Sequence, residues 1–256
     1  YNGHFNVDMD APIATFNWGQ RAISAWLSAS PRSDVAAYRS LFFGDGQPTF
    51  ERRPNVKPAR ALNDSQQAAV LNALRADRLA LVHGPPGTGK TRTLVEIGRL
   101  AVASGERVLA CAMSNAATDH LVADLSAAGL RVVRLGHPAR ISAGAEDCAL
   151  DTQLEQTDAS RLARKWMAEA RQIRNKVEQR FSRGALDRRG RREALCDARR
   201  LEKDAREQLR LAREAILDRA QVICATATGA GHPLLQRFSF DRVLLDEATQ
   251  CPDPLA

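Results

Sequence analysis

The chain has 256 residues and a hydrophobic content of 44%, which is enough to fill the core of one large domain with an insertion. It contains no run of roughly 18 apolar residues, the length that a membrane-spanning helix needs, and no secretory signal pattern at its start. Its five cysteines are odd in number and widely spaced, which argues against a disulfide framework and against paired metal ligands. We therefore expect a soluble cytoplasmic protein that does not contact a membrane.

The formal net charge of +7 comes from one segment of the chain. Residues 161–219 hold 19 Lys or Arg and 10 Asp or Glu, whereas the rest of the chain holds 18 and 20. Such a block is typical of a surface that binds a polyanion, and equally typical of a solvated helix face that is crossed by ion pairs. The sequence leaves both interpretations open.

Residues 1–58 are predicted to form a helical segment followed by a linker. Apolar periodicity predicts one helix from about residue 18 to 27 and another from about 35 to 43. The glycines and prolines between residues 44 and 58 predict turns and a connection into the main domain.

Residues 59–256 alternate short apolar, β-branched runs with helix-like segments, which predicts an α/β fold with a parallel sheet built from βαβ units. In such a sheet the functional loops follow the carboxyl ends of the strands. We expect every strand to be buried. The predicted strands are residues 79–83, 108–112, 132–135, 222–226 and 243–246.

A basic insertion at residues 155–219 interrupts this alternation and has a helical period. Its pattern predicts two antiparallel helices, the second of about 28 residues and therefore about 42 Å long, that project from the sheet domain. We interpret the apolar stripe as the seam between the two helices. The residues of that stripe are Leu162, Trp166, Ile173, Val177 and Phe181, followed by Leu201, Ala205, Leu209, Ala212 and Ile216.

A glycine-rich loop follows the first predicted strand and precedes a predicted helix at residues 91–103. It matches the pattern G-x-x-x-x-G-K-S/T, whose glycines let backbone N–H groups surround phosphate oxygens. Lys90 is then expected to reach the β- and γ-phosphates, and the Thr91 hydroxyl to bind Mg²⁺, which predicts a site for ATP with magnesium. The loop consists of Gly84, Pro85, Pro86, Gly87, Thr88, Gly89, Lys90 and Thr91.

Two adjacent carboxylates follow the last apolar strand. Asp246 at the strand end is expected to hold the metal, directly or through water, and Glu247 to polarise the attacking water as a general base. Adjacent acids are common on solvated surfaces, but their place directly after three apolar residues favours a catalytic interpretation.

Five segments carry a family resemblance. They read DEATQ at 246–250, LNDSQQAAV at 62–70, AMSNAATDHL at 112–121, RLGHPAR at 134–140 and CATATGAG at 224–231. In order and spacing they resemble the motifs of superfamily 1B helicases of the up-frameshift and immunoglobulin mu-binding protein type. The resemblance implies a RecA-like P-loop ATPase domain that couples ATP hydrolysis to movement on single-stranded DNA or RNA.

The resemblance also implies roles for individual residues. Gln66 would read the adenine edge, and Gln250 would couple the γ-phosphate to strand movement, acting in catalysis with Lys90 and Glu247. Small polar side chains at strand ends would contact the sugar-phosphate backbone, although helix capping is a common alternative role for such hydroxyls. These contact residues are Ser114, Asn115, Thr226 and Thr228.

Helicases of this superfamily place ATP between two RecA-like domains, and the second supplies arginine fingers. The resemblance therefore implies that this chain is an N-terminal part of a larger helicase, that the second domain is missing, and that residues 1–58 are the remnant of a stalk or accessory domain. Two alternatives stay open: an ATP-gated nucleic-acid-binding module without unwinding activity, and an unrelated P-loop ATPase that acts on protein. The sequence does not distinguish DNA from RNA.

Overall fold

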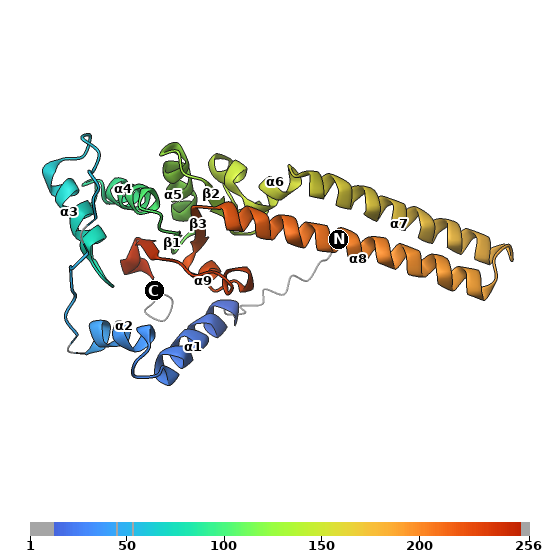
Figure 1. The fold of residues 1–256 in the computed structure, drawn as a ribbon, viewed down its shortest axis with the longest axis horizontal. Helices are drawn as coiled ribbons and strands as arrows, with labels where there is room; N and C mark the ends of the chain where they lie inside the picture. Colours follow the sequence, from blue (N-terminus) through green and yellow to red (C-terminus); the bar gives the residue numbers. More distant parts are fainter. Residues whose placement is uncertain (1–12, 45, 53, 252–256) are drawn as a thin grey trace, which may run out of the picture.

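The computed structural model describes residues 13–44, 46–52 and 54–251 and shows a sheet domain from which a long helical hairpin extends (Figure 1). Four strands form one parallel sheet in the order β2-β3-β1-β4. This confirms the predicted α/β class with a parallel sheet. The strands are β1 (Val108–Ala112), β2 (Val132–Arg134), β3 (Val222–Thr226) and β4 (Arg242–Asp246).

Helices surround the sheet and precede it in the chain. The α-helices are α1 (Ile13–Ser28), α2 (Asp34–Phe43), α3 (Asp64–Arg75), α4 (Lys90–Ala103), α5 (Asn115–Ala127), α6 (Leu150–Glu155), α7 (Asp158–Ser182), α8 (Arg188–Arg219) and α9 (Ala227–Ala230). Short 3₁₀ turns are η1 (Pro138–Arg140), η2 (Ala143–Cys148), η3 (Pro233–Leu235) and η4 (Ala248–Gln250). The helices predicted at 18–27, 35–43 and 91–103 are confirmed as α1, α2 and α4, with slightly wider bounds.

Successive residues of each strand face opposite cores, because side chains alternate across a sheet. In β1, Val108 and Ala110 pack in the core with α3, α4 and α5, whereas Leu109 and Cys111 pack in the core with α6 and the end of α8. Burial raises the pKa of the Cys111 thiol to about 12, so Cys111 packs as a neutral side chain. The sheet is therefore covered on both faces, which explains why the central strand β1 is apolar throughout.

The strand predicted at residues 79–83 is wrong: the structure has a loop there. The side chain of Leu81 is 83% exposed, and Val243 on the neighbouring β4 is 60% exposed, so the expectation of burial also fails at this edge. An apolar run predicts burial but does not supply a partner strand. Within the described residues 13–44, 46–52 and 54–251, β4 pairs only with β1 and therefore not with residues 79–83. Without a ladder of backbone hydrogen bonds, residues 79–83 do not join the sheet.

Glu96 fastens the first residue of the 59–256 domain to α4. Its carboxylate is buried in α4 and accepts a hydrogen bond of 2.7 Å from the backbone N–H of Ala59. Arg99 donates to both carboxylate oxygens at 2.8 Å, and this contact holds the pKa of Glu96 below its usual range. Since the pKa is lowered on folding, the pair stabilises the fold at neutral pH and loses that contribution as pH falls through the lowered pKa.

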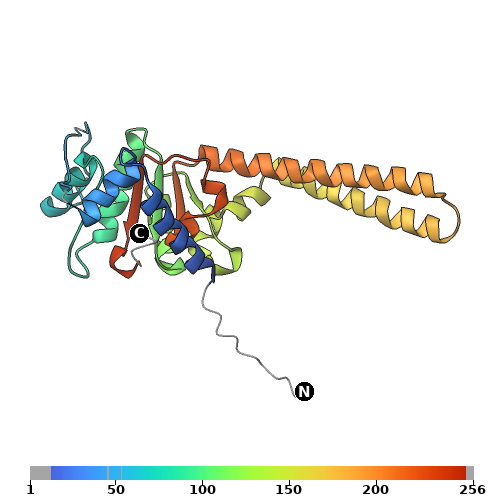
Figure 2. The same ribbon diagram turned by 90° about the horizontal axis from the view of Figure 1, so that it is seen from below.

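The predicted insertion is a hairpin of two antiparallel helices, α7 and α8, that projects from the sheet domain (Figures 1 and 2). Gly184 turns the chain between them with a φ of +68°, a left-handed conformation that suits glycine. At 1.5 Å per residue the 32 residues of α8 extend about 48 Å. No helix of residues 13–44, 46–52 and 54–251 is long and apolar enough to cross a membrane.

Small side chains form the centre of the hairpin seam. Ala163, Ala170 and Ala198 are fully buried, together with the predicted seam residue Ala205. The absence of bulk at these positions lets the two helix backbones approach closely. Of the larger predicted seam residues, Val177 is buried as well. The half-buried ones are Trp166, Ile173, Phe181, Leu201 and Leu209. Leu162 is 38% exposed and was wrongly assigned to the seam.

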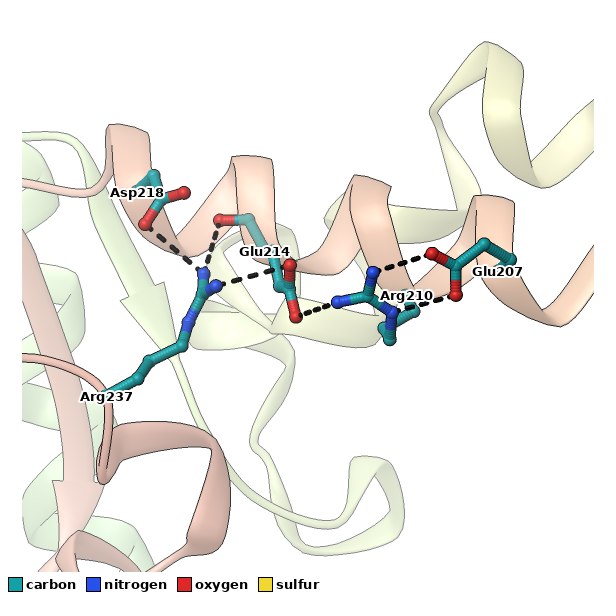
Figure 3. Close-up of polar contacts among 5 residues, drawn as sticks. All are labelled: Glu207, Arg210, Glu214, Asp218 and Arg237. Carbon is teal, nitrogen blue, oxygen red and sulfur yellow. Dashed lines mark hydrogen bonds and ion pairs between the residues drawn. The ribbon is translucent and has the colours of Figure 1, made fainter.

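The base of the hairpin is joined to the sheet domain by ion pairs (Figure 3). Arg237, in the connection before β4, lies 3.2 Å from carboxylate oxygens of both Glu214 and Asp218 on α8. Glu214 also pairs with Arg210, which in turn pairs with Glu207. Exposed pairs each contribute about 0–1 kcal/mol, so this network orients the base of α8 more than it stabilises the fold.

Candidate nucleotide and nucleic-acid site

The glycine-rich loop at residues 84–91 is closed on itself. Gly87 and Gly89 both have a φ of +79°, a conformation that other residues adopt only with strain. A Cβ atom at Gly84 would lie 2.7 Å from the Thr88 hydroxyl oxygen, which itself donates a 2.7 Å hydrogen bond to the carbonyl of Pro85. The compact loop therefore depends on glycine at each of these three positions.

Lys90 lies at the junction between this loop and α4. Its Nζ atom donates to the carbonyl oxygens of Gly84 at 3.0 Å and Pro85 at 3.3 Å, so the ammonium group is held against the loop. Helix α4 begins at Lys90, and its N-cap Gly89 offers no side-chain acceptor to the N–H groups of the first turn. Free N–H groups, the helix dipole and a lysine together form a binding site for an anion such as phosphate.

Asp246 meets this loop from a distant part of the chain. It ends β4, and its Oδ2 atom accepts a 3.1 Å hydrogen bond from the hydroxyl of Thr91. Both side chains are partly buried. Two oxygen ligands from separate segments thus converge beside the lysine, as Mg²⁺ binding requires.

Glu247 turns the chain sharply after Asp246. Within residues 13–44, 46–52 and 54–251, Glu247 is the one non-glycine residue with a positive φ, which is 52°. Its backbone N–H donates a 3.0 Å hydrogen bond to Asp246 Oδ1. Such strain is often found at functional sites. The turn leaves the Glu247 carboxylate exposed, with Gln250 Nε2 donating to it at 3.4 Å.

Gln66 lies beside the glycine-rich loop. Its Nε2 atom donates to the carbonyl of Thr88 at 2.9 Å, and a Cβ atom at Gly89 would lie 2.6 Å from Nε2. Its Oε1 atom accepts from the N–H of Asn63, which completes a capping box at the start of α3. The hydrogen bond to Thr88 uses one of the two hydrogens on Nε2, which leaves the second as a donor for the predicted contact with adenine.

The predicted nucleic-acid contacts gather at one edge of the sheet. Ala112 pairs in register with Thr226 on one side and with Asp246 on the other, so the carboxyl ends of β3, β1 and β4 are level. Ser114 and Thr226 each cap a helix, accepting from backbone N–H groups at 3.1 Å. Capping uses the oxygen as an acceptor and leaves each hydroxyl hydrogen available to donate. Thr228 lies 3.2 Å from Thr226, oxygen to oxygen.

Asn115 is hydrogen-bonded to an arginine that the sequence did not mark as a site residue. Its Oδ1 atom accepts a 2.9 Å hydrogen bond from Arg134, whose side chain is 1% exposed and pairs with the buried Asp119. The signal in the sequence is a charged residue, Arg134, within the apolar run 132–135, since a charge is rarely buried without a partner.

A glycine-rich loop at a helix N-terminus, with a carboxylate from a neighbouring parallel strand, defines a P-loop NTPase domain. The family model described as an AAA domain matches residues 61–256. DNA-binding protein SMUBP-2 of Mesocricetus auratus is 37% identical over 79% of this chain and 20% of that protein. DNA polymerase alpha-associated DNA helicase A of Schizosaccharomyces pombe is 37% identical over 76% and 29%. ATP-dependent helicase upf1 of the same yeast is 30% identical over 98% and 26%.

The chain belongs to the superfamily 1B helicases of the up-frameshift and immunoglobulin mu-binding protein type, a family of ATP-hydrolysing helicases. It spans between about a fifth and three tenths of the length of these relatives.

Proposed function

We propose that this chain forms a motor domain that binds and hydrolyses ATP and couples the reaction to single-stranded DNA or RNA. The observation that carries the proposal is the 3.1 Å contact between Thr91 and Asp246, which lies at the same sheet edge as Thr226. A nucleotide site and polar strand-end residues thus share one edge. The names of the relatives, which include a DNA-binding protein and two helicases, support this assignment.

The residues at the loop fit ATP and Mg²⁺. Positive groups at the N-terminus of α4 and Lys90 would hold the phosphates, and Thr91 and Asp246 would hold the metal, which prefers oxygen ligands. When bound, Mg²⁺ neutralises charge that develops on the phosphate oxygens. We assign Gln66 to the adenine because its hydrogen bond to the carbonyl of Thr88 holds its amide beside the proposed nucleotide-binding loop.

The remaining steps belong to exposed or partly buried side chains. Glu247 follows directly after β4, and its exposed carboxylate would orient the attacking water and accept its proton. Gln250 contacts Glu247 and would report the state of the γ-phosphate to the strand-binding edge. Ser114, Asn115 and the two threonines at 226 and 228 would hold the sugar-phosphate backbone without reading base sequence.

We divide the chain into an accessory segment at 1–58 and a RecA-like domain at 59–256 that carries the hairpin insertion at 155–219. We further propose that a second RecA-like domain supplies arginine fingers to the transition state, as the family resemblance implies. A finger is worth about 10³ to 10⁵ in rate. The 256-residue chain alone should therefore bind ATP and hydrolyse it slowly.

Comparing the isolated chain with a longer protein that joins it to a second RecA-like domain tests the function. We expect both proteins to bind ATP. Only the longer protein should show strong stimulation of ATP hydrolysis by single-stranded DNA or RNA, and only the longer protein should displace a strand in a duplex assay. Stimulation without strand displacement would favour an ATP-gated binding module. The absence of any response to nucleic acid would overturn the proposal in favour of another substrate, and robust unwinding by the isolated chain would refute the need for a second domain.

We also propose that the basic hairpin helps to hold nucleic acid. Six arginines contact carboxylates at its surface and base, as the ion-pair interpretation predicts. Other arginines are exposed and have no carboxylate partner in the part of the chain that the structure describes, among them Arg180, Arg199 and Arg206. These unpaired charges are the ones that a phosphate backbone would neutralise.

Replacing Arg180, Arg199 and Arg206 with glutamine should weaken single-strand binding by the chain. If all three arginines contact phosphates, the slope of log affinity against log salt concentration should become shallower by about 2, since each phosphate contact on a single strand contributes about 0.7 to its magnitude. Fluorescence anisotropy of a labelled oligonucleotide, titrated at several salt concentrations, measures both quantities.

The matched control removes the same number of charges from arginines that already have a carboxylate partner: Arg161, Arg174 and Arg189. We expect the control triple variant to change the salt slope much less. Equal effects of the two triple variants would attribute binding to overall charge, and no effect of either would favour a solvated, ion-paired surface.

A further inference from the structure

Arg134 occupies a position where a charge is costly. It ends β2 with 1% of its side chain exposed, and its Nε atom donates to Asp119 Oδ1 at 2.8 Å. Its Nη2 atom donates to Asn115 Oδ1 at 2.9 Å, and its Nη1 atom donates to the carbonyl of Leu135. Each nitrogen of this guanidinium thus donates to an acceptor, and two of the three acceptors lie on α5.

The surrounding chain is built around this guanidinium. A Cβ atom at Gly136 would lie 3.0 Å from Arg134 Nη1, so a side chain at residue 136 would displace the guanidinium by a few tenths of an ångström. The second carboxylate oxygen of Asp119 accepts a 2.8 Å hydrogen bond from the N–H of Ser142, which closes the 136–142 loop over the pair. The charges are therefore matched, and each nitrogen of the guanidinium has a hydrogen-bond acceptor, but the pair is buried.

Stability alone does not account for this arrangement, because a buried ion pair often contributes no more than well-packed apolar residues would. Its specific consequence is the orientation of Asn115. Arginine has donors and no acceptor, so only the oxygen of the Asn115 amide can face it. The amide nitrogen is then turned away from Arg134, and Asn115 is only partly buried at the carboxyl end of β1.

We propose that Arg134 is a positioning residue for nucleic-acid binding, which fixes the Asn115 amide so that Nδ2 donates to a backbone phosphate. The proposal rests on the proposed function. Phosphate oxygens are acceptors only, so a flipped amide would present its oxygen and repel the strand. Arg134 never touches the strand itself but selects the orientation of Asn115 that binds it.

Four variants of the 256-residue chain test this proposal. Asn115→Ala removes the donor, and Gly136→Ala shifts the guanidinium by a few tenths of an ångström relative to its acceptors without asking alanine to adopt a positive φ. The third variant combines both changes. The control is Gly144→Ala, because a Cβ atom at Gly144 would meet nothing within 4 Å.

The affinity for a labelled oligothymidylate is measured by anisotropy, beside the affinity for a fluorescent ATP analogue and the midpoint of thermal unfolding. We expect Asn115→Ala to lower strand affinity about 10-fold, as loss of one hydrogen bond to a charged group would. Gly136→Ala should lower it several-fold, the double variant no further than Asn115→Ala, and Gly144→Ala not at all. Affinity for the ATP analogue should stay unchanged in all four variants.

The non-additive result is specific to positioning, since a purely structural role would leave the two effects independent. Multiplied effects in the double variant, or wild-type strand affinity in Gly136→Ala or in Asn115→Ala, would overturn the role of Arg134. A wild-type chain that binds no oligonucleotide would instead contradict the proposed function, so the two failures are distinguishable.

Discussion

Replacing Glu247 with glutamine should lower the rate of ATP hydrolysis by about 10²- to 10⁴-fold, the usual contribution of a general base, while leaving ATP affinity nearly unchanged. Glutamine keeps the size and the hydrogen-bonding oxygen of the side chain but cannot take up a proton at neutral pH. Glu247 is exposed and lies one residue beyond Asp246, the proposed metal ligand, so its loss should not disturb the glycine-rich loop that would hold the phosphates.

The rate should be measured at saturating ATP and single-stranded nucleic acid, in the longer protein that contains a second RecA-like domain. Glu146→Gln is a suitable control, because Glu146 is an exposed glutamate on η2 that forms no ion pair in the part of the chain that the structure describes. Hydrolysis at the wild-type rate in Glu247→Gln would assign the base to another residue. A parallel loss of ATP affinity would point to a binding role for Glu247.

Replacing Lys90 with alanine should impair both binding and chemistry. Charge-assisted hydrogen bonds contribute about 1.5–3 kcal/mol, so affinity for ATP should fall by about 10- to 100-fold. Hydrolysis should fall further, on the order of 10³-fold, because in the proposed role the lysine would also stabilise charge that develops on the phosphate. Alanine is the strongest helix former, so α4, which begins at this residue, should remain intact.

Titration of a fluorescent ATP analogue into the isolated chain measures the loss of affinity, and the longer protein gives the hydrolysis rate. Lys57→Ala, at an exposed position in the linker, is the matched control and should behave as wild type. Unchanged ATP affinity in Lys90→Ala would mean that the ammonium group, which contacts the carbonyls of Gly84 and Pro85, only closes the loop.

Local features of this chain follow from local sequence. The runs at 108–112 and 222–226 form strands with the predicted bounds, because β-branched and apolar residues favour a strand that is buried on both faces. The turn at Gly87 and Gly89 and the start of α4 at Lys90 follow from the conformational freedom of glycine. The same reasoning identified the hairpin, whose 3.6-residue period is independent of the rest of the fold.

Features that depend on distant residues follow only from the tertiary structure. The order β2-β3-β1-β4 places Asp246 beside Thr91, although 155 positions separate them in the sequence. The hairpin seam is centred on alanines because close approach of two helices selects small residues, whereas periodicity draws attention to large ones. Pairing at a sheet edge likewise depends on what lies beyond it, so the apolar run at 79–83 predicted a strand that the structure does not contain.

The sequence by itself determined the glycine-rich loop before α4, the place of two carboxylates after β4, the parallel α/β class and the family, because each depends on short-range patterns of residue type and spacing. Only the tertiary structure decided how Arg134 is used. Its charge in an apolar strand signals a partner, but Asp119 and Asn115 are identified as partners only when β2 and α5 pack together. A buried guanidinium acquires its role from the acceptors that surround it, and those acceptors are set by the fold.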